Sequence, residues 1–482
     1  MDAFFAGVDN ISNFLWGGTW NDERILPLAP LAVILLGTGT WFMIATGLRP
    51  VLRFGPALKE VWDGRKAQGT EGSITPWQAL FTALSGQVGT GNLAGVATAL
   101  TLGGPGAIFW MWITAILGMA CAFAESSLAV KYRETHEGTL RGGPMYYIKN
   151  GLNKGRGGVG GAFGWLALFF CFGTLFSAFI TGGMVQSNSV MQTVTQSSRE
   201  FLDMEFPPAI IGGILAAMVF VVIIGGIKSI GSIAGKLVPT MALAYVLLAL
   251  VVLIMYAENI PAAFGLIFSY AFGLEQAVGG AAGYGVMQAI RYGVARGLFS
   301  NEAGQGSAPI AHSTAQTGGP VVQGEIAMVG VFIDTVIICT MTALVLLCVN
   351  GAYPMEGGGT TEFVWMSDAL DASAKTSAAY SQAIPFGGLF ISIALFLFAF
   401  TTMLGWSYYA ETAVTYILGE KAVLPLKFIW VIIIFLGATV SQTESLWRFA
   451  DIANAMMTLP NLIAITLLSG SVIAIHKENK RG

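Results

Sequence analysis

The chain has 482 residues, of which 55% are hydrophobic and only 11% charged, and its mean hydropathy is +0.69. Soluble domains carry about 25% charged residues, so this composition excludes an ordinary soluble domain and indicates a polytopic membrane protein. The formal net charge is −3, and in a membrane protein the placement of the charges matters more than their sum.

The sequence predicts an all-α membrane protein with eleven transmembrane helices, because eleven apolar segments have about the 20 residues that a span needs. The segments lie near residues 27–48, 76–101, 104–130, 161–190, 207–228, 231–257, 261–290, 321–350, 385–418, 423–440 and 447–475. We expect four parts, which are an N-terminal segment with one extra span (1–75), two groups of five spans (76–258 and 259–476) and a cytoplasmic tail (477–482).

Lysine and arginine residues sort onto one side of this arrangement. With the N-terminus outside, 20 of the 24 fall on the cytoplasmic side, among them Arg291 and Arg296. The four that fall outside are Arg24, Arg199, Lys375 and Arg448. This asymmetry satisfies the positive-inside rule and predicts a multi-pass cell-membrane protein with a cytoplasmic C-terminus and an external loop at 351–384.

The second predicted span contains the stretch SGQVGTGNLAG at residues 85–95. Glycine in a helix interior costs about 1 kcal/mol relative to alanine, so three glycines at Gly86, Gly89 and Gly91 disfavour a continuous helix. Close packing of small residues would explain the glycines, but not the polar side chains around them. A broken helix explains both, because its free backbone groups can bind a carboxylate and a cation at membrane depth.

A second glycine-rich stretch, VGGAAGYG at residues 278–285, lies in the seventh predicted span. Paired interruptions in the two groups of five spans indicate an inverted-repeat transporter with its binding site between them. We therefore expect the second helix to break here, with Gly283 and Tyr284 beside the substrate.

Residues 103–118, GGPGAIFWMWITAILG, resemble the signature of the sodium:alanine (alanine or glycine:cation) symporter family. Three further stretches are similar to the same family, namely SGQVGTGNLAG, GVARGLFSNEAGQGSAPIAH at 293–312 and FAFTTMLGWSYY at 398–409. The resemblance implies a LeuT-type fold of ten core helices plus one N-terminal helix. It also implies uptake of small neutral amino acids, such as alanine and glycine, coupled to sodium or to protons and without any cofactor.

The resemblance also implies roles for residues near the first interruption, where Gly89-Thr90-Gly91-Asn92 looks like the G-x-G-N pattern of LeuT-type transporters. The residues expected to hold cations are Ser85, Gln87, Val88, Asn92, Thr401 and Thr402. The backbone expected to bind the substrate comprises Ser85, Gly89, Thr90 and Gly91, and Trp406 is expected to limit the size of the substrate side chain.

Two further polar residues lie within predicted spans. Asp334, halfway along 321–350, either binds a cation or a proton or is a buried acceptor for a hydroxyl such as that of Thr335. Gln186 either binds the substrate carboxylate or makes a contact between helices.

Charged residues near the predicted cytoplasmic ends suggest gates. Glu125 and Glu411 are expected in gating or interfacial salt bridges, and Arg291 and Arg296 are expected to pair with Glu302 in an inner gate.

Four function classes are compared. A cation-coupled symporter agrees with all these features, whereas a channel would need a ring of polar residues or a repeated filter sequence. A membrane enzyme would need a nucleophile–base pair or a metal-ligand cluster, and an amino-acid sensor would add a soluble signalling domain. The expected partners are therefore a small neutral amino acid, sodium and the lipid bilayer, and no nucleic acid.

Overall fold

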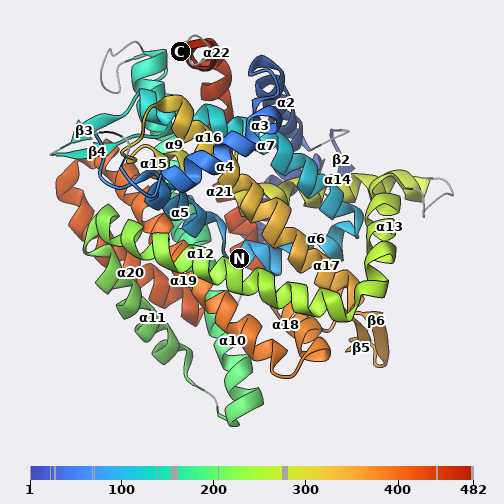
Figure 1. Cartoon of the computed structure of the whole chain (residues 1–482). Coiled ribbons are helices and arrows are strands. Elements are labelled where there is room, and N and C mark those ends of the chain that lie inside the picture. Colours follow the sequence, from blue (N-terminus) through green and yellow to red (C-terminus); the bar gives the residue numbers. More distant parts are fainter. Residues whose placement is uncertain are drawn as a thin grey trace.

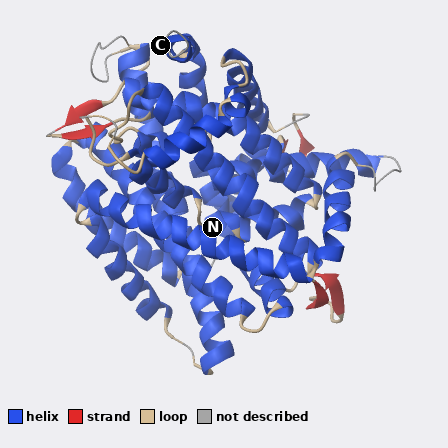
Figure 2. Cartoon of the chain, in the orientation of Figure 1, coloured by secondary structure: helices blue, strands red, loops and turns tan. Residues whose placement is uncertain are grey.

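The computed structural model describes residues 2–21, 23–26, 29–67, 69, 71–136, 138–153, 161–204, 206–273, 280–440 and 443–478. Helices form nearly all of this part, and three short antiparallel strand pairs lie at its periphery (Figure 2). Figure 1 shows the β5–β6 hairpin and the C-terminus at opposite ends of the helix bundle.

The elements follow one another in three stretches. Residues 2–63 form α1 (Asp2–Gly17), β1 (Thr19–Trp20), β2 (Glu23–Arg24), α2 (Pro30–Ala45), α3 (Arg49–Leu52) and α4 (Phe54–Asp63). Residues 76–259 form α5 (Pro76–Gln87), η1 (Thr90–Asn92), α6 (Ala94–Gly103), α7 (Gly106–Lys131), β3 (Glu134–His136), β4 (Thr139–Arg141), α8 (Pro144–Tyr147), η2 (Ile148–Leu152), α9 (Gly164–Ser177), η3 (Ala178–Met184), α10 (Val185–Leu202), α11 (Pro208–Ile223), α12 (Gly226–Met255) and η4 (Ala257–Asn259). Residues 260–478 form α13 (Ile260–Ala271), α14 (Gly280–Asn301), α15 (Ala308–His312), α16 (Pro320–Val331), η5 (Phe332–Cys339), α17 (Thr340–Cys348), β5 (Asn350–Pro354), β6 (Thr360–Phe363), η6 (Val364–Met366), α18 (Ala372–Ala383), α19 (Gly387–Leu418), η7 (Glu420–Ala422), α20 (Val423–Thr439), α21 (Thr443–Leu467) and α22 (Ser469–Glu478).

Several helices are long and apolar enough to cross a bilayer. Within the described residues these are 106–131, 164–199, 226–255, 320–348, 387–418, 420–439 and 446–467, and shorter apolar helices lie at 30–45, 94–103 and 208–223. The protein is therefore a helical membrane protein with several spans, and eleven remains the predicted number of crossings.

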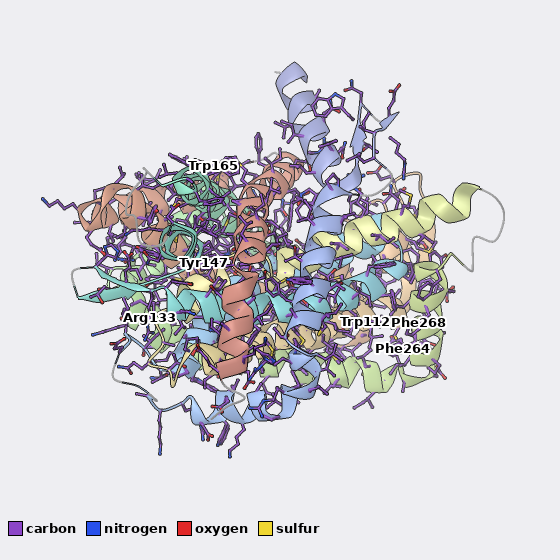
Figure 3. The ribbon with its side chains drawn as sticks, turned by 90° about the horizontal axis from the view of Figure 1, so that it is seen from above. Trp112, Arg133, Tyr147, Trp165, Phe264 and Phe268 are labelled. Atoms are coloured by element: carbon purple, nitrogen blue, oxygen red, sulfur yellow. The ribbon has the colours of Figure 1, made fainter. Side chains whose placement is uncertain are left out.

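Helix α7 occupies the centre of the bundle, where it contacts α2, α13, α14 and α16. At one edge Trp112 of α7 lies beside Phe264 and Phe268 of α13, with ring centroids about 6 Å apart (Figure 3). The Trp112 indole also donates a hydrogen bond to Thr340 Oγ1 at 2.8 Å, so α7 is tied to α17 as well.

The first interruption lies where the sequence predicts it. Helix α5 ends at Gln87, the single turn η1 follows, and α6 begins only at Ala94. Every residue between Ser85 and Ala97 is buried, so the freed backbone groups lie inside the protein rather than in lipid.

The second interruption was predicted at the wrong place. Residues 278–279 lie outside the described part, but residues 280–285 are the first turns of α14, which runs unbroken to Asn301. The helix stops at residues 302–307 and α15 follows, with left-handed backbone at Glu302 (φ 55°), Gly304 (φ 87°) and Gly306 (φ 86°). The glycines at 280 and 283 lie within this helix and so permit a break without requiring one, whereas left-handed residues cannot continue an α-helix.

Two long helices contain π-helical turns that the sequence analysis did not predict. These are η3, between α9 and α10, and η5, between α16 and α17. Such turns widen a helix locally and occur often at functional sites, and these two place Gln186 and Asp334 next to the first interruption.

Candidate functional site

The first interruption replaces lost helical hydrogen bonds with a side-chain bond. Gly89 N donates to Asn92 Oδ1 at 2.8 Å, so the asparagine side chain closes the turn formed by residues 89–92. The amide nitrogen of Asn92 points the other way, to Asp334 Oδ1 at 2.6 Å and Ser300 Oγ at 3.1 Å. Asn92, predicted as a cation ligand, thus also holds the shape of the unwound segment.

Gly89 lies so close to α19 and α10 that no side chain fits there. A Cβ atom at this position would meet Thr402 Oγ1 at 2.6 Å and Gln186 Oε1 at 3.2 Å. Thr402 Oγ1 lies 3.3 Å from Val88 O, and Thr90 N donates to Gln186 Oε1 at 3.3 Å. Two helices, α10 and α19, therefore converge on residues 88–90.

Oxygen atoms suited to an alkali cation gather at this contact. Thr402 Oγ1 lies between Val88 O and Phe398 O, which is 2.9 Å away, and carbonyls and hydroxyls of this kind bind sodium at broken helices. The Thr401 hydroxyl is directed to Phe398 O and Leu397 O instead, at 3.0 and 3.1 Å. The structure thus brings Thr402 to Val88 and leaves Thr401 bonded within its own helix.

Ser85 and Gln87 lie at the end of α5. The Ser85 hydroxyl donates within its helix to Thr82 O at 2.7 Å, and Gln87 Nε2 donates to Asn301 O at 2.7 Å. The Gln87 side chain therefore joins the first interruption to the last residue of α14, directly before the second interruption.

Asp334 is fully buried and accepts three hydrogen bonds. Its Oδ2 accepts from Ser300 Oγ at 2.7 Å and from Thr335 Oγ1 at 2.8 Å, and its Oδ1 accepts from Asn92 Nδ2. Two of these donors, Asn92 and Ser300, belong to the edges of the two interruptions. The carboxylate thereby fastens the two interruptions to each other.

The second interruption carries its own buried polar groups. Glu302 Oε2 accepts from Ser307 Oγ at 2.6 Å across the loop. Gln305 Nε2 donates to Asn454 Oδ1 at 3.3 Å, which links the loop to α21. Sequence analysis assigned Glu302 only to an inner gate and gave Gln305 no role, although a cluster of polar residues among glycines, NEAGQGS, marks this loop as it does the first interruption.

Glu125 is buried beside this second loop and is bonded to an asparagine rather than to a partner in an interfacial salt bridge. Asn461 Nδ2 donates to Glu125 Oε1 and also to Gly304 O, the latter at 2.9 Å, and Tyr147 donates to the Asn461 side chain. Glu411 forms the expected kind of ion pair, with Arg141 at 2.9 Å.

Trp406 lies on α19, one turn beyond Thr402. Only 2% of it is exposed, and its ring meets the Tyr409 ring edge-on at 5.4 Å between centroids. Gly182 of the π turn η3 packs so closely that a Cβ atom there would lie 2.4 Å from Trp406 Cβ. The Trp406 side chain is therefore held between η3 and Tyr409.

Several buried polar atoms at the two interruptions have no hydrogen-bond partner among the described residues. These are Gln87 Oε1, Thr90 Oγ1, Gln305 Oε1 and Tyr409 Oη. An unsatisfied buried polar group costs about 1–3 kcal/mol, so these four atoms keep hydrogen-bonding capacity for a water molecule or a polar ligand.

Four predicted residues do not join this site. Gly283 and Tyr284 lie in the first turns of α14, and 17 residues of helix put Tyr284 about 25 Å before the second interruption. Arg291 and Arg296 do not pair with Glu302. Arg291 Nη2 donates to Asn13 Oδ1 at 2.7 Å, and Arg296 Nη2 pairs with Asp451 Oδ2 at 3.1 Å.

These two arginines also lie at the opposite end of the bundle from the predicted inner gate. They line a cavity together with Leu102 at the end of α6 and Asp371 in the predicted external loop. The error follows from the misplaced interruption, because a span that breaks at 302–307 runs through 291 and 296 rather than ending before them.

An aromatic pair separates this cavity from the first interruption. The Phe299 and Trp447 rings lie 5.1 Å apart, and Phe299 Cδ1 would contact a Cβ atom placed on Gly91 at 2.9 Å. Together with the Arg296–Asp451 ion pair, this aromatic pair joins α14 to α21 between the cavity and the first interruption. No spacing in the sequence marks these residues, because their partners lie more than 140 positions apart.

Comparison with known sequences gives a consistent result. The model of the sodium:alanine symporter family matches residues 11–481. The sodium/alanine symporter AgcS of Methanococcus maripaludis is 41% identical, over 98% of this chain and 97% of that protein. The amino-acid carrier protein AlsT of Bacillus subtilis is 37% identical, over 99% of this chain and 93% of AlsT.

Comparison with solved structures shows the fold. The crystal structure of MhsT in complex with L-phenylalanine matches with a TM-score of 0.56, over 83% of this chain and 90% of MhsT. At 13% identity this similarity concerns the fold alone, which is the LeuT type.

Proposed function

The chain belongs to the sodium:alanine symporter family, and from this premise we propose that it imports alanine and glycine with sodium by alternating access. Membership makes the protein a sodium-coupled amino-acid symporter, which is a transporter rather than an enzyme. The substrate, the coupling geometry and the sidedness are our proposals.

The unpartnered polar atoms at the two interruptions carry the proposal. The ends of α5 and α15 and the edges of η1 offer backbone groups to the amino and carboxylate groups of an amino acid. Gln186, which already accepts from Thr90 N, is proposed to contact the carboxylate end. Trp406 then leaves room for a methyl group or a hydrogen atom, which favours alanine and glycine.

We propose that one sodium ion binds between Val88 O, Ser85 O and the hydroxyls of Thr401 and Thr402. In this structure Thr402 already faces Val88, and binding would require Thr401 to turn from Phe398 O. Asn92, Gln87 and Asp334 are proposed for a second cation, either sodium or a proton. A bound cation stabilises the unwound backbone, so each ligand raises the affinity for the other.

We further propose that residues 76–258 and 259–476 are the two inverted repeats. Residues 1–75 then supply the extra helix and 477–482 the cytoplasmic tail, with the N-terminus outside. The two interruptions, at 88–93 and 302–307, would be the corresponding broken helices of the two repeats.

Uptake into proteoliposomes tests the proposal. Labelled alanine should accumulate when an inward sodium gradient is imposed, and accumulation should vanish when choline replaces sodium at fixed pH. Counterflow of labelled alanine against unlabelled alanine should also occur, because a carrier exchanges its substrate. A channel would give no counterflow, and a sensor would bind alanine without moving it.

A further inference from the structure

A cavity of about 460 Å³ lies where the end of α1 and the β1–β2 hairpin meet the first half of α14. Figure 1 shows β2 beside α14. Among the described residues that line this cavity, Arg24 and Arg291 are the only charged ones. A lining with two guanidinium groups and no carboxylate favours an anion.

The two arginines converge on one face of α14. Arg24 Nη1 lies 2.7 Å from Met287 Sδ, and Arg291 is one helical turn further along the same face. Arg291 Nη2 donates to Asn13 Oδ1 at 2.7 Å, and a Cβ atom placed on Gly17 would lie 2.8 Å from Arg291 Cζ. Helix α1 therefore holds the Arg291 guanidinium in place through a neutral partner, which leaves its charge uncompensated.

The carboxylates nearby have other partners. Arg291 also lines the neighbouring cavity that contains Arg296, but there Asp451 and Asp9 each pair with a different arginine and Asp371 caps α18. Glu23 of β2 is exposed and does not line the cavity of Arg24 and Arg291. The positive charge of this cavity is therefore not balanced by its own lining.

The depth of Arg291 in the bilayer follows from its position on α14. It precedes Asn301, where α14 meets the second interruption, by ten residues, which is about 15 Å of helix. Broken helices of transporters lie near the bilayer midplane, and half of the hydrocarbon core is about 15 Å thick. Arg291 therefore lies at the level where the hydrocarbon gives way to the lipid phosphates.

An apolar surface continues from the cavity toward the bilayer centre. Ala29 lines the cavity and directly precedes α2, on which Val33, Ile34 and Trp41 are 50%, 38% and 47% exposed. Trp20 of the hairpin is also exposed, as is typical of a tryptophan at the membrane interface. Acyl chains can lie along α2 while a headgroup occupies the cavity, so the surroundings favour a lipid over a free anion.

We propose that this cavity binds the phosphate group of an anionic phospholipid, with Arg24 and Arg291 as its two cationic partners. Guanidinium groups suit this role because their donors match the spacing of phosphate oxygens. A zwitterionic phospholipid fits less well, since its ammonium group would meet no carboxylate in the lining. The proposal does not depend on which amino acid the protein transports.

Native mass spectrometry of the full-length protein in a non-ionic detergent tests the proposal. Phosphatidylglycerol and phosphatidylcholine with the same acyl chains are titrated, and the dissociation constant of the first bound lipid is measured. We expect phosphatidylglycerol to bind about tenfold more tightly or better. Glycerol phosphate, which has the phosphate without acyl chains, should not displace it at millimolar concentration.

Variants locate the bound lipid. In R24Q/R291Q we expect phosphatidylglycerol to bind about tenfold more weakly or worse, because two charge-assisted contacts are lost. R24Q alone changes an exposed side chain and should weaken binding about threefold or more. R65Q/K66Q also removes two positive charges, from exposed positions outside the cavity, and should bind phosphatidylglycerol as the parent protein does.

Four outcomes would overturn the lipid site. They are equal affinity for the two lipids, parent-like binding in R24Q and in R24Q/R291Q, an equal loss in R65Q/K66Q, and displacement by glycerol phosphate, which would indicate a site for a free phosphate. The unfolding temperature of each variant without lipid shows whether it is folded. If R24Q/R291Q does not fold, R24Q and R65Q/K66Q decide the outcome.

Discussion

At the scale of single residues, Asn92 connects the unwound backbone to a buried carboxylate. Its oxygen accepts from Gly89 N, and its nitrogen donates to Asp334 Oδ1. We expect Asn92→Ala to raise the sodium concentration for half-maximal uptake roughly 10- to 100-fold, because a hydrogen bond to a charged group contributes about 1.5–3 kcal/mol. The measurement is alanine uptake at graded sodium. Asn188→Ala, which removes a buried amide at the α10–α20 contact, is the control, and an unchanged sodium dependence in N92A would remove Asn92 from the cation site.

Asp334 accepts three hydrogen bonds through two oxygens. Asparagine has nearly the same shape but no charge, so this substitution separates the effect of the charge from that of the shape. Asp334→Asn keeps the size of the side chain but replaces one acceptor oxygen with an NH₂ group, which removes the acceptor for Asn92 Nδ2 or makes the Ser300 and Thr335 hydroxyls turn to accept. We expect sodium-dependent uptake to fall by about tenfold or more. Thermal unfolding measured with and without sodium separates the two roles. If the variant is less stable yet still gains stability from sodium, Asp334 is a structural acceptor and not a cation ligand.

Trp406 is the residue from which we expect a change of specificity. Trp406→Ala should admit leucine and methionine, because a clamped ring excludes them by volume and packed interiors do not deform continuously. Alanine should bind roughly tenfold more weakly, since its methyl group loses a packing partner. Equilibrium binding of alanine and leucine to purified protein provides the measurement.

The matched control for this substitution is Trp430→Ala, which removes another buried tryptophan, from α20. It should leave the preference for alanine unchanged. If W406A still binds alanine as before and still rejects leucine, then Trp406 does not bound the substrate.

At the scale of elements, the two interruptions differ in how clearly the sequence predicts them. Glycines mixed with Ser85, Gln87 and Asn92 correctly predicted the first break, because those side chains need partners that a lipid-facing helix lacks. Glycine alone misled at 280–285, which are helical and where no polar side chain accompanies it apart from Tyr284. The stretch NEAGQGS at 301–307 has the same mixture of glycines and polar residues as the first break. The hydropathy pattern placed this stretch at the end of a span, so the break was not predicted there.

The π turns show a different limit of sequence-based prediction. An inserted residue changes neither the composition nor the apolar character of the segment, so a hydropathy window does not detect η3 and η5. Their effect is nevertheless large, because they carry Gln186 and Asp334 to residues 90 and 92.

The close approach of Gly89 to α19 gives a prediction at this scale. Gly89→Ala places a methyl group 2.6 Å from Thr402 Oγ1, so either this hydroxyl turns away or α19 shifts, and in both cases the oxygen leaves Val88 O and the proposed sodium site is disrupted. We expect loss of the stabilisation by sodium, measured as the shift of the unfolding temperature on adding sodium. Gly95→Ala is the matched control, because a Cβ atom there meets nothing within 4 Å. G95A should keep the shift, and a normal shift in G89A would argue against sodium at this contact.

At the scale of the whole molecule, composition predicted the class and apolar length predicted most helices. The interval 261–290 was the exception, because it contains two helices, α13 and α14, which a hydropathy window merges into one span. Because of this merger, the sequence analysis assigned Arg291 and Arg296 to the cytoplasmic side of the membrane. Moving both to the outside leaves 18 of the 24 lysines and arginines inside, so the positive-inside rule still favours an external N-terminus.

Thiol labelling of intact cells tests this orientation, since buried native cysteines contribute little background. Met366→Cys, beside the β5–β6 hairpin, should react with a membrane-impermeant maleimide in intact cells. Leu418→Cys, at the far end of α19, should react only after the membrane is permeabilised. Both side chains are at least half exposed, so a difference between them reports the side of the membrane rather than burial. The reverse pattern would put the N-terminus inside and would place the cavity lined by Arg291 and Arg296 on the cytoplasmic face.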